Sequence, residues 1–139
     1  MPEQPRPPER TSGTEDREPR TLISPVEVYD LEREVERLTR EPEWSDGHQN
    51  AVTLAKGSTL RIVLVAMKPG ARVGEDEAHG RMSVQVLRGA VSVRRPEHGR
   101  ELAAGQLAAM NAGEAWSIEA RVESAILLTI AWPEERSLL

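Results

Sequence analysis

The stretch PGARVGEDEAHGRMSVQVLRGAVSV, from Pro69 to Val93, contains the pattern that decides the fold. A hydrophobic period of two runs through Met82–Leu87 and again through Ala90–Arg95. Side chains of a β-strand point alternately to opposite faces, so this period predicts two strands. We expect the two strands to pair with each other across Arg88-Gly89.

The same pattern continues on both sides of this stretch. Further strands are predicted at residues 51–55, 59–67, 101–103, 106–110, 115–119 and 125–132. The turns between them carry Lys56-Gly57-Ser58, Lys68-Pro69-Gly70 and Pro96-Glu97-His98-Gly99. Many short strands without an intervening helix favour an all-β sandwich or barrel. The barrel domain is expected to cover residues 45–139.

The N-terminal side differs in composition. Residues 1–21 contain five prolines and charges of both signs, and Met1 is their only apolar side chain. Such a segment buries too little apolar area to offset the entropy cost of ordering, so we expect a disordered tail. The tail is either an inert extension or a tether for a partner.

One helix is predicted within residues 22–44. Its N-cap is Ser24, in the capping-box pattern Ser24-Pro25-Val26-Glu27, or alternatively Asp30, and Pro42 is expected to end it. An apolar stripe follows the helical spacing at Val28, Leu31, Val35 and Leu38. The stripe docks on the barrel or lies at a dimer interface.

Composition excludes several classes of function. The chain has no cysteine, so disulfides, thiol nucleophiles and cysteine-bound zinc are absent. A net charge of -5 and only four aromatic residues argue against nucleic-acid binding. The longest apolar run, Ile62–Met67, is too short to span a membrane. No signal segment is evident, and we expect a cytoplasmic protein.

Residues 105–120 resemble the second signature of the cupin family, which reads Gly, five residues, Pro-x-Gly, two residues, His, three residues, Asn. Gly105 and Gly113 stand at the two glycine positions. Asn111 replaces the proline, Trp116 the histidine and Ala120 the asparagine. The resemblance covers about residues 51–132 and implies a cupin-type jelly-roll β-barrel.

The first cupin signature falls between Gly70 and Gly89 in two competing registers. Counting back from Gly89 puts Met82 at the glutamate position and the two histidine positions near Glu75 and Glu77. Taking His79 as the second histidine puts Glu77 at the first, Ser83 at the glutamate, and Gly89 one residue early. Neither register contains two histidines and a glutamate.

These replacements bear on the metal that the resemblance implies. Cupin sites bind Fe, Mn, Ni, Cu or Zn through imidazoles and a carboxylate, whereas tryptophan offers a metal no lone pair. Glu75, Glu77 and His79 are the remaining ligand candidates, for a weakly bound divalent transition metal at most. We expect no cofactor. His48 and His98 lie in predicted loops and are expected to be solvated.

Three functions remain open. The first is a metal-free barrel that binds a small molecule or acts as a regulatory module, with Trp116 and Gln85 lining its cavity if Gln85 faces inward. The second is an enzyme that uses Glu77 and His79, either with a metal as an oxygenase or isomerase or by proton transfer. The i, i+2 spacing of this pair would place both side chains on one strand face. The third is a degenerate structural barrel. A homodimer is implied by the resemblance in each case.

Overall fold

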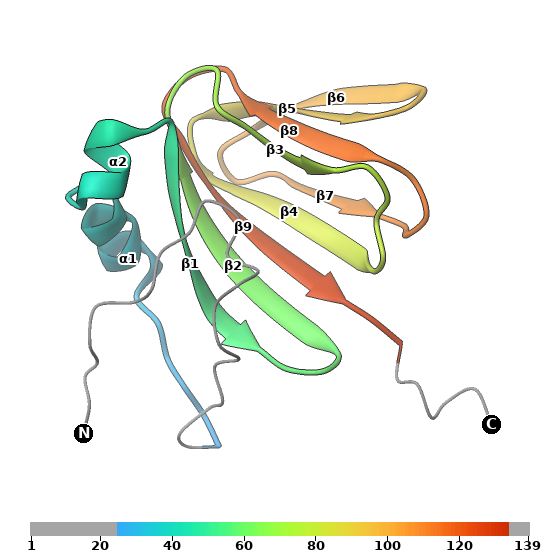
Figure 1. The fold of residues 1–139 in the computed structure, drawn as a ribbon, viewed down its shortest axis with the longest axis horizontal. Coiled ribbons are helices and arrows are strands. Elements are labelled where there is room, and N and C mark those ends of the chain that lie inside the picture. The colour runs from blue at the N-terminus through green and yellow to red at the C-terminus, as the bar shows by residue number, and fades with distance from the viewer. Residues whose placement is uncertain (1–24, 134–139) are drawn as a thin grey trace.

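Two antiparallel β-sheets make up most of residues 25–133, the residues that the computed structural model describes (Figure 1). The five-stranded sheet has the order β1 (Gln49–Lys56), β2 (Leu60–Met67), β9 (Ser124–Ala131), β4 (Arg81–Arg88) and β7 (Leu107–Met110). The four-stranded sheet has the order β3 (Arg72–Glu75), β8 (Trp116–Ala120), β5 (Ala90–Arg95) and β6 (His98–Ala103). The all-β jelly-roll architecture predicted from the sequence is confirmed. The predicted tail and Ser24 lie outside the described residues.

Two strand predictions were wrong. The strands β4 and β5 do not pair, because β4 lies between β9 and β7 while β5 lies between β8 and β6. The chain instead crosses from one sheet to the other at Gly89, whose φ is 85°. The sequence reading also missed β3, a four-residue strand that contains Gly74 and no alternating apolar pattern.

The core lies between the two sheets. Residues that alternate along each strand point inward, as Met82, Val84 and Val86 do on β4. The four-stranded sheet contributes Ile118 and Trp116 from β8, and Trp116 is the aromatic residue of this core cluster. Aliphatic side chains therefore fill the space between the sheets, as the lack of phenylalanine predicts.

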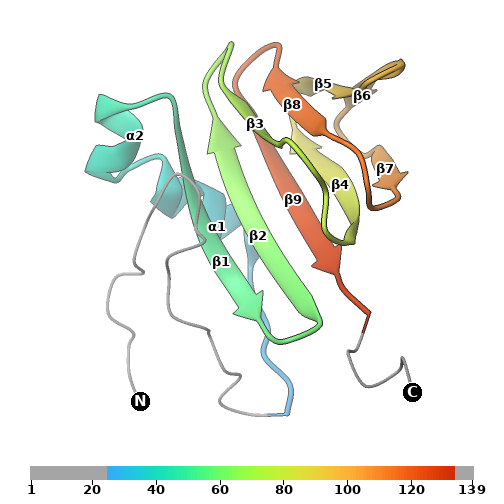
Figure 2. The same ribbon diagram turned by 45° about the vertical axis from the view of Figure 1, so that its right-hand side comes forward.

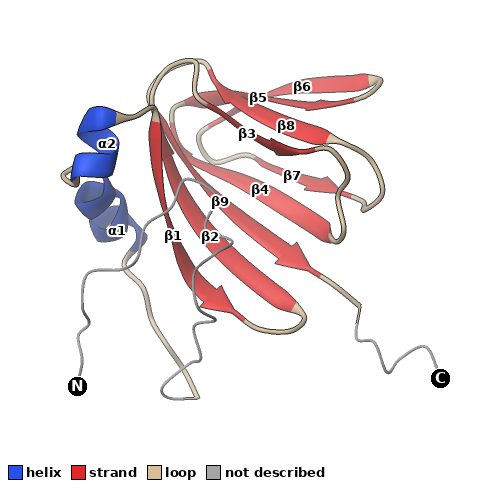
Figure 3. Ribbon diagram, viewed as in Figure 1, coloured by secondary structure: helices blue, strands red, loops and turns tan. Residues whose placement is uncertain are grey.

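Two helices, α1 (Leu31–Leu38) and α2 (Pro42–Asp46), lie on the other face of the five-stranded sheet (Figures 2 and 3). Asp30 is the N-cap of α1, and its side chain accepts a hydrogen bond from the Arg33 amide at 3.2 Å. Pro42 opens α2 rather than ending α1, because proline is tolerated in the first turn of a helix. The predicted single helix over residues 22–44 is therefore corrected to two. Neither helix is long and apolar enough to cross a membrane.

The apolar stripe of α1 packs within the chain. Val35 and Leu38 are buried against a cluster that includes Leu64 of β2, whereas Val28 precedes the helix and is 85% exposed. The docked arrangement of the stripe is thus the one observed. The homodimer implied by the resemblance stays a prediction, and these two side chains give it no support.

Asn50 joins the helices to the sheet. Its Nδ2 donates to the Leu38 carbonyl at 3.0 Å and to a Glu41 carboxylate oxygen at 2.9 Å, and its Oδ1 accepts from the Ala51 amide. Asn50→Ala leaves buried groups without partners and is expected to lower the free energy of unfolding by about 1–3 kcal/mol. Urea denaturation measures the effect. Asn111→Ala, at an exposed position, is the matched control, and equal losses in the two variants would contradict the prediction.

Candidate functional site

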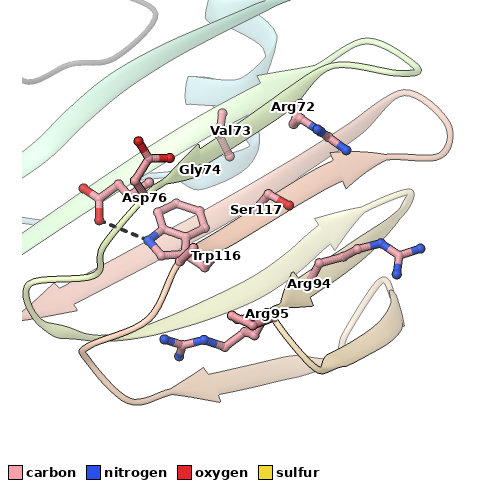
Figure 4. Close-up of a pocket in the computed structure, with 11 residues that line it drawn as sticks. Arg72, Val73, Gly74, Asp76, Arg94, Arg95, Trp116 and Ser117 are labelled. Atoms are coloured by element: carbon pink, nitrogen blue, oxygen red, sulfur yellow. Dashed lines mark hydrogen bonds between the residues drawn. The ribbon is translucent and has the colours of Figure 1, made fainter.

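A groove of about 490 Å³ lies along the four-stranded sheet (Figure 4). Three runs of the chain line it: residues 72–76 of β3 and the bend after it, residues 94–96 at the end of β5, and residues 115–117 at the start of β8. No lining residue belongs to the five-stranded sheet. The groove is therefore a feature of one sheet and does not lie in the interior between the two sheets.

The groove opens on the outer face of that sheet. Trp116 and Ile118 belong to the core, so the half-buried Ser117 between them faces the other way. Ser117 lies opposite Gly74 of β3 on one side and Arg94 of β5 on the other. These three residues form one row across the outer face, and glycine and serine at its centre leave space above the sheet.

Gly74 allows the two strands to approach closely. A Cβ atom at this position would overlap the carbonyl oxygen of Trp116 and would lie 3.0 Å from the Cα of Ser117. Any larger residue would have to push β3 away from β8, since backbone atoms cannot yield as a flexible side chain does. Gly74 thus sets the depth of the groove floor.

Arg95 fixes one wall. Its guanidinium donates to the Asn111 carbonyl at 2.6 Å and to the Glu114 carbonyl at 3.0 Å, and its Nε lies 3.7 Å from the Glu114 carboxylate. The side chain is only 12% exposed. These contacts tie the loop before β8 to the end of β5, so Arg95 supports the wall.

Charged side chains surround the row of Gly74, Ser117 and Arg94. Arg72 lies 3.6 Å from Glu119, and Arg121 forms a closer pair with Glu101 at 3.2 Å. The hydrogen bond from Arg121 is the main cause that holds the pKa of Glu101 below its ordinary value, and the same bond raises the pKa of Arg121. These two pairs lie on the outer face, beside the groove.

Trp116 contacts Glu75 at the end of the same strands. Its indole Nε1 donates to Glu75 Oε1 at 3.0 Å, and the two residues are directly opposite each other in the β3–β8 pairing. In the register counted from Gly89, one histidine position of the first cupin signature falls near Glu75, and Trp116 stands at the histidine position of the second signature. In this chain the two side chains hydrogen-bond to each other, and Trp116 also packs in the core with 6% of its surface exposed.

The other sequence-predicted residues are placed elsewhere. Glu77 and His79 are exposed in the segment between β3 and β4, so the expected shared strand face is wrong, because β3 ends at Glu75. Gln85 lies opposite Leu107 and Leu127, on the face of β4 that points away from the core. Gln85 therefore does not line a cavity with Trp116.

The structure gives little support to a metal site of the expected kind. Within residues 25–133, no three histidine, aspartate or glutamate side chains lie close enough together to hold a metal ion. Glu75, Glu77 and His79 accordingly do not form a ligand set, and the indole of Trp116 cannot serve as a ligand. His48 and His98 are exposed, as their predicted loop or turn positions suggested, although His98 begins β6.

Several residues of the groove were not anticipated from the sequence. Arg72 and Gly74 belong to the strand that the sequence reading missed, and the sequence did not single out Ser117 as a site residue. Arg94 sits in a correctly predicted strand, and the alternation with Val93 was the signal that could have placed it on the outer face.

Comparison with known proteins identifies the fold. No protein-family model and no curated protein sequence matches the chain. Among solved structures, salicylate 1,2-dioxygenase from Pseudoaminobacter salicylatoxidans is similar with a TM-score of 0.68 and 21% identity, over 86% of this chain and 38% of that one. A conserved protein of unknown function from Streptococcus pyogenes gives a TM-score of 0.64 and 22% identity, over 86% and 98% of the two chains.

A third match carries the family name. A cupin superfamily protein from Desulfitobacterium hafniense gives a TM-score of 0.58 and 18% identity, over 61% of this chain and 78% of that one. Structures with this fold thus include an enzyme, a protein of unknown function and a domain of a transcriptional regulator from Enterobacter cloacae. Identities at this level establish architecture and leave activity open. The chain has the fold of the cupin superfamily.

Proposed function

We propose that this chain is a cupin-fold binding protein that holds a small organic molecule in the outer groove of its four-stranded sheet and needs no transition metal to do so. The groove of about 490 Å³ beside Ser117 is the observation that carries the proposal. Its volume falls in the range of small-molecule sites. Its lining combines the apolar Pro96 with the basic residues Arg72 and Arg94.

Two features of the core support an outer rather than an inner site. Side chains from both sheets form one continuous cluster between the sheets. Trp116 occupies a position that the cupin resemblance gives to a ligand, and its only hydrogen-bonding group is donated to Glu75. No observation favours proton-transfer chemistry at Glu77 and His79, since both are exposed in a connecting segment.

Ser117→Phe is expected to block the groove. The phenyl ring would fill the space above Gly74 while leaving the core-facing side of β8 unchanged. The measurement is a set of ¹⁵N–¹H correlation spectra recorded with a library of small polar fragments. Binders should shift the amide signals of Gly74 and Ser117 in the unmodified protein, and these shifts should vanish in the variant.

Ser83→Phe is the matched control for this experiment. Ser83 is also a half-buried strand serine, but it lies on the outer face of the five-stranded sheet. Fragment shifts that persist in Ser117→Phe, or that map away from the groove, would overturn the proposed site. Metal analysis by mass spectrometry tests the proposal that binding needs no transition metal. Near-stoichiometric Fe, Mn, Ni, Cu or Zn in untagged protein purified without chelators would contradict it.

A further inference from the structure

The two acids that line the groove have no ion-pair partner. Glu75 is the last residue of β3, and Asp76 follows it in the bend. Within residues 25–133 neither carboxylate forms a salt bridge, and the one side-chain hydrogen bond found for the pair runs from the Trp116 indole to Glu75 Oε1. Both side chains are exposed. Their remaining oxygen atoms can therefore accept hydrogen bonds from a molecule in the groove.

Two of the three arginines that line the groove are engaged with acids outside it. Arg72 lies 3.6 Å from Glu119. Arg95 lies 3.7 Å from the Glu114 carboxylate, and its guanidinium donates to two carbonyls of the loop before β8. Neither arginine is thus left to neutralise the acids of the groove.

The third arginine, Arg94, reaches toward the other side of its strand. One of its guanidinium nitrogens lies over Gly99 of β6, 3.0 Å from the position that a Cβ would take there. Its charge interacts with Glu101 of the same strand. Figure 4 shows the Arg94 side chain directed away from the indole of Trp116, whereas Asp76 lies beside that indole. The unbalanced charge of the groove is therefore negative and lies at its Trp116 end.

Resting on the proposed function, we infer that the groove binds a small organic cation that carries N–H donors, such as an alkylammonium or alkylguanidinium ion. Its charged head lies at Glu75 and Asp76, which supply both the opposite charge and the hydrogen-bond acceptors. Pro96 and Ala115, which also line the groove, offer an apolar surface to the alkyl chain. A quaternary ammonium ion lacks N–H donors, and the indole of Trp116 offers it little aromatic face because only 6% of this residue is exposed.

Five compounds with the same butyl or propyl chain length test this assignment: butylammonium, butylguanidinium, butyltrimethylammonium, 1-butanol and butyrate. Titrations followed by the amide signals of Gly74 and Ser117 give the dissociation constants. We expect butylammonium and butylguanidinium to bind about fivefold more tightly than 1-butanol, since exposed ion pairs contribute modestly. Butyltrimethylammonium should bind more weakly than butylammonium, and butyrate more weakly than 1-butanol. The preference for the cations should decrease as salt is added.

Two charge-removing variants locate the charged head. Glu75→Gln and Asp76→Asn should each reduce the advantage of butylammonium over 1-butanol, and the double variant should abolish it. Glu75→Gln keeps a carbonyl oxygen that can accept from the Trp116 indole, so the contact between β3 and β8 is retained. Glu123→Gln is the matched control, because Glu123 is an exposed acid in the turn beyond the other end of β8. It should leave every affinity unchanged.

The outcomes separate the inference from the proposal on which it rests. Equal affinities for butylammonium and 1-butanol, equal affinities for butylammonium and butyltrimethylammonium, or an advantage that survives the double variant overturn the inference while groove binding stands. Calcium chloride is titrated in parallel, and groove shifts that saturate at a lower concentration of Ca²⁺ than of butylammonium would overturn it in favour of an inorganic cation. If none of the five compounds shifts the groove signals while other fragments do, the inference also fails. If no fragment shifts them at all, the proposed function fails with it.

Discussion

Trp116→Ala is expected to lower the free energy of unfolding by roughly 3–5 kcal/mol, as large-to-small substitutions of core aromatics do. The indole is 6% exposed and packs in the cluster between the two sheets. Its removal leaves a cavity that the rigid strands around it cannot fill, and it also deletes the hydrogen bond to Glu75. Urea denaturation followed by far-UV circular dichroism measures the loss.

Trp132→Ala is the control for this substitution. Trp132 follows β9, is only partly buried and lies outside the core cluster, with Arg61 5.2 Å from the centre of its ring. Its replacement should lower the free energy of unfolding by clearly less than Trp116→Ala does. A Trp116→Ala protein that keeps nearly full stability but no longer binds fragments would contradict the core role and make the indole a direct ligand contact.

Gly89→Ala is expected to destabilise the protein by roughly 2–5 kcal/mol. A φ of 85° costs a non-glycine residue about 1–2 kcal/mol. The added Cβ would also overlap Ser124 Oγ and the Glu123 carbonyl oxygen, and such overpacking costs about 1–3 kcal/mol. Ser124 cannot move freely, because its hydroxyl donates to the Val122 carbonyl and accepts from the Ala90 amide. Thermal unfolding is a suitable measurement.

Gly105→Ala separates the two contributions. Gly105 has nearly the same φ, 90°, but nothing lies within 4 Å of the position that a Cβ would take. Its replacement should therefore show only the conformational cost of about 1–2 kcal/mol. Equal losses at the two glycines would show that crowding at Gly89 contributes nothing.

The fold was largely predictable because its signals are local. The alternation of Val84, Gln85 and Val86 identifies a strand from neighbouring residues, and glycine positions mark the turns. The pairing of strands is set by contacts between distant residues, so the sequence suggested a β4–β5 hairpin where the chain instead changes sheets. The N-cap alternatives illustrate the same limit, since Ser24 and Asp30 offer similar local chemistry.

The candidate site was much less predictable. A groove on a sheet surface depends on which strands are neighbours, and Gly74, Ser117 and Arg94 belong to three strands far apart in the sequence. The cupin resemblance pointed to Glu77 and His79 as site residues. The sequence around them did not show that β3 ends before both of them. Trp116 was singled out by its place in the second signature, and its partner Glu75 emerged only from the pairing of β3 with β8.

The position of β9 has a consequence for how this protein folds during synthesis. This strand comes last among the described elements, yet it forms the middle of the five-stranded sheet, between β2 and β4. Until the ribosome has released residues 124–131, β2 and β4 each present an unpaired edge, and unpaired edges are prone to associate with other chains. We expect the larger sheet to close only after translation has passed β9. Such long-range pairing slows folding relative to helical proteins of similar size.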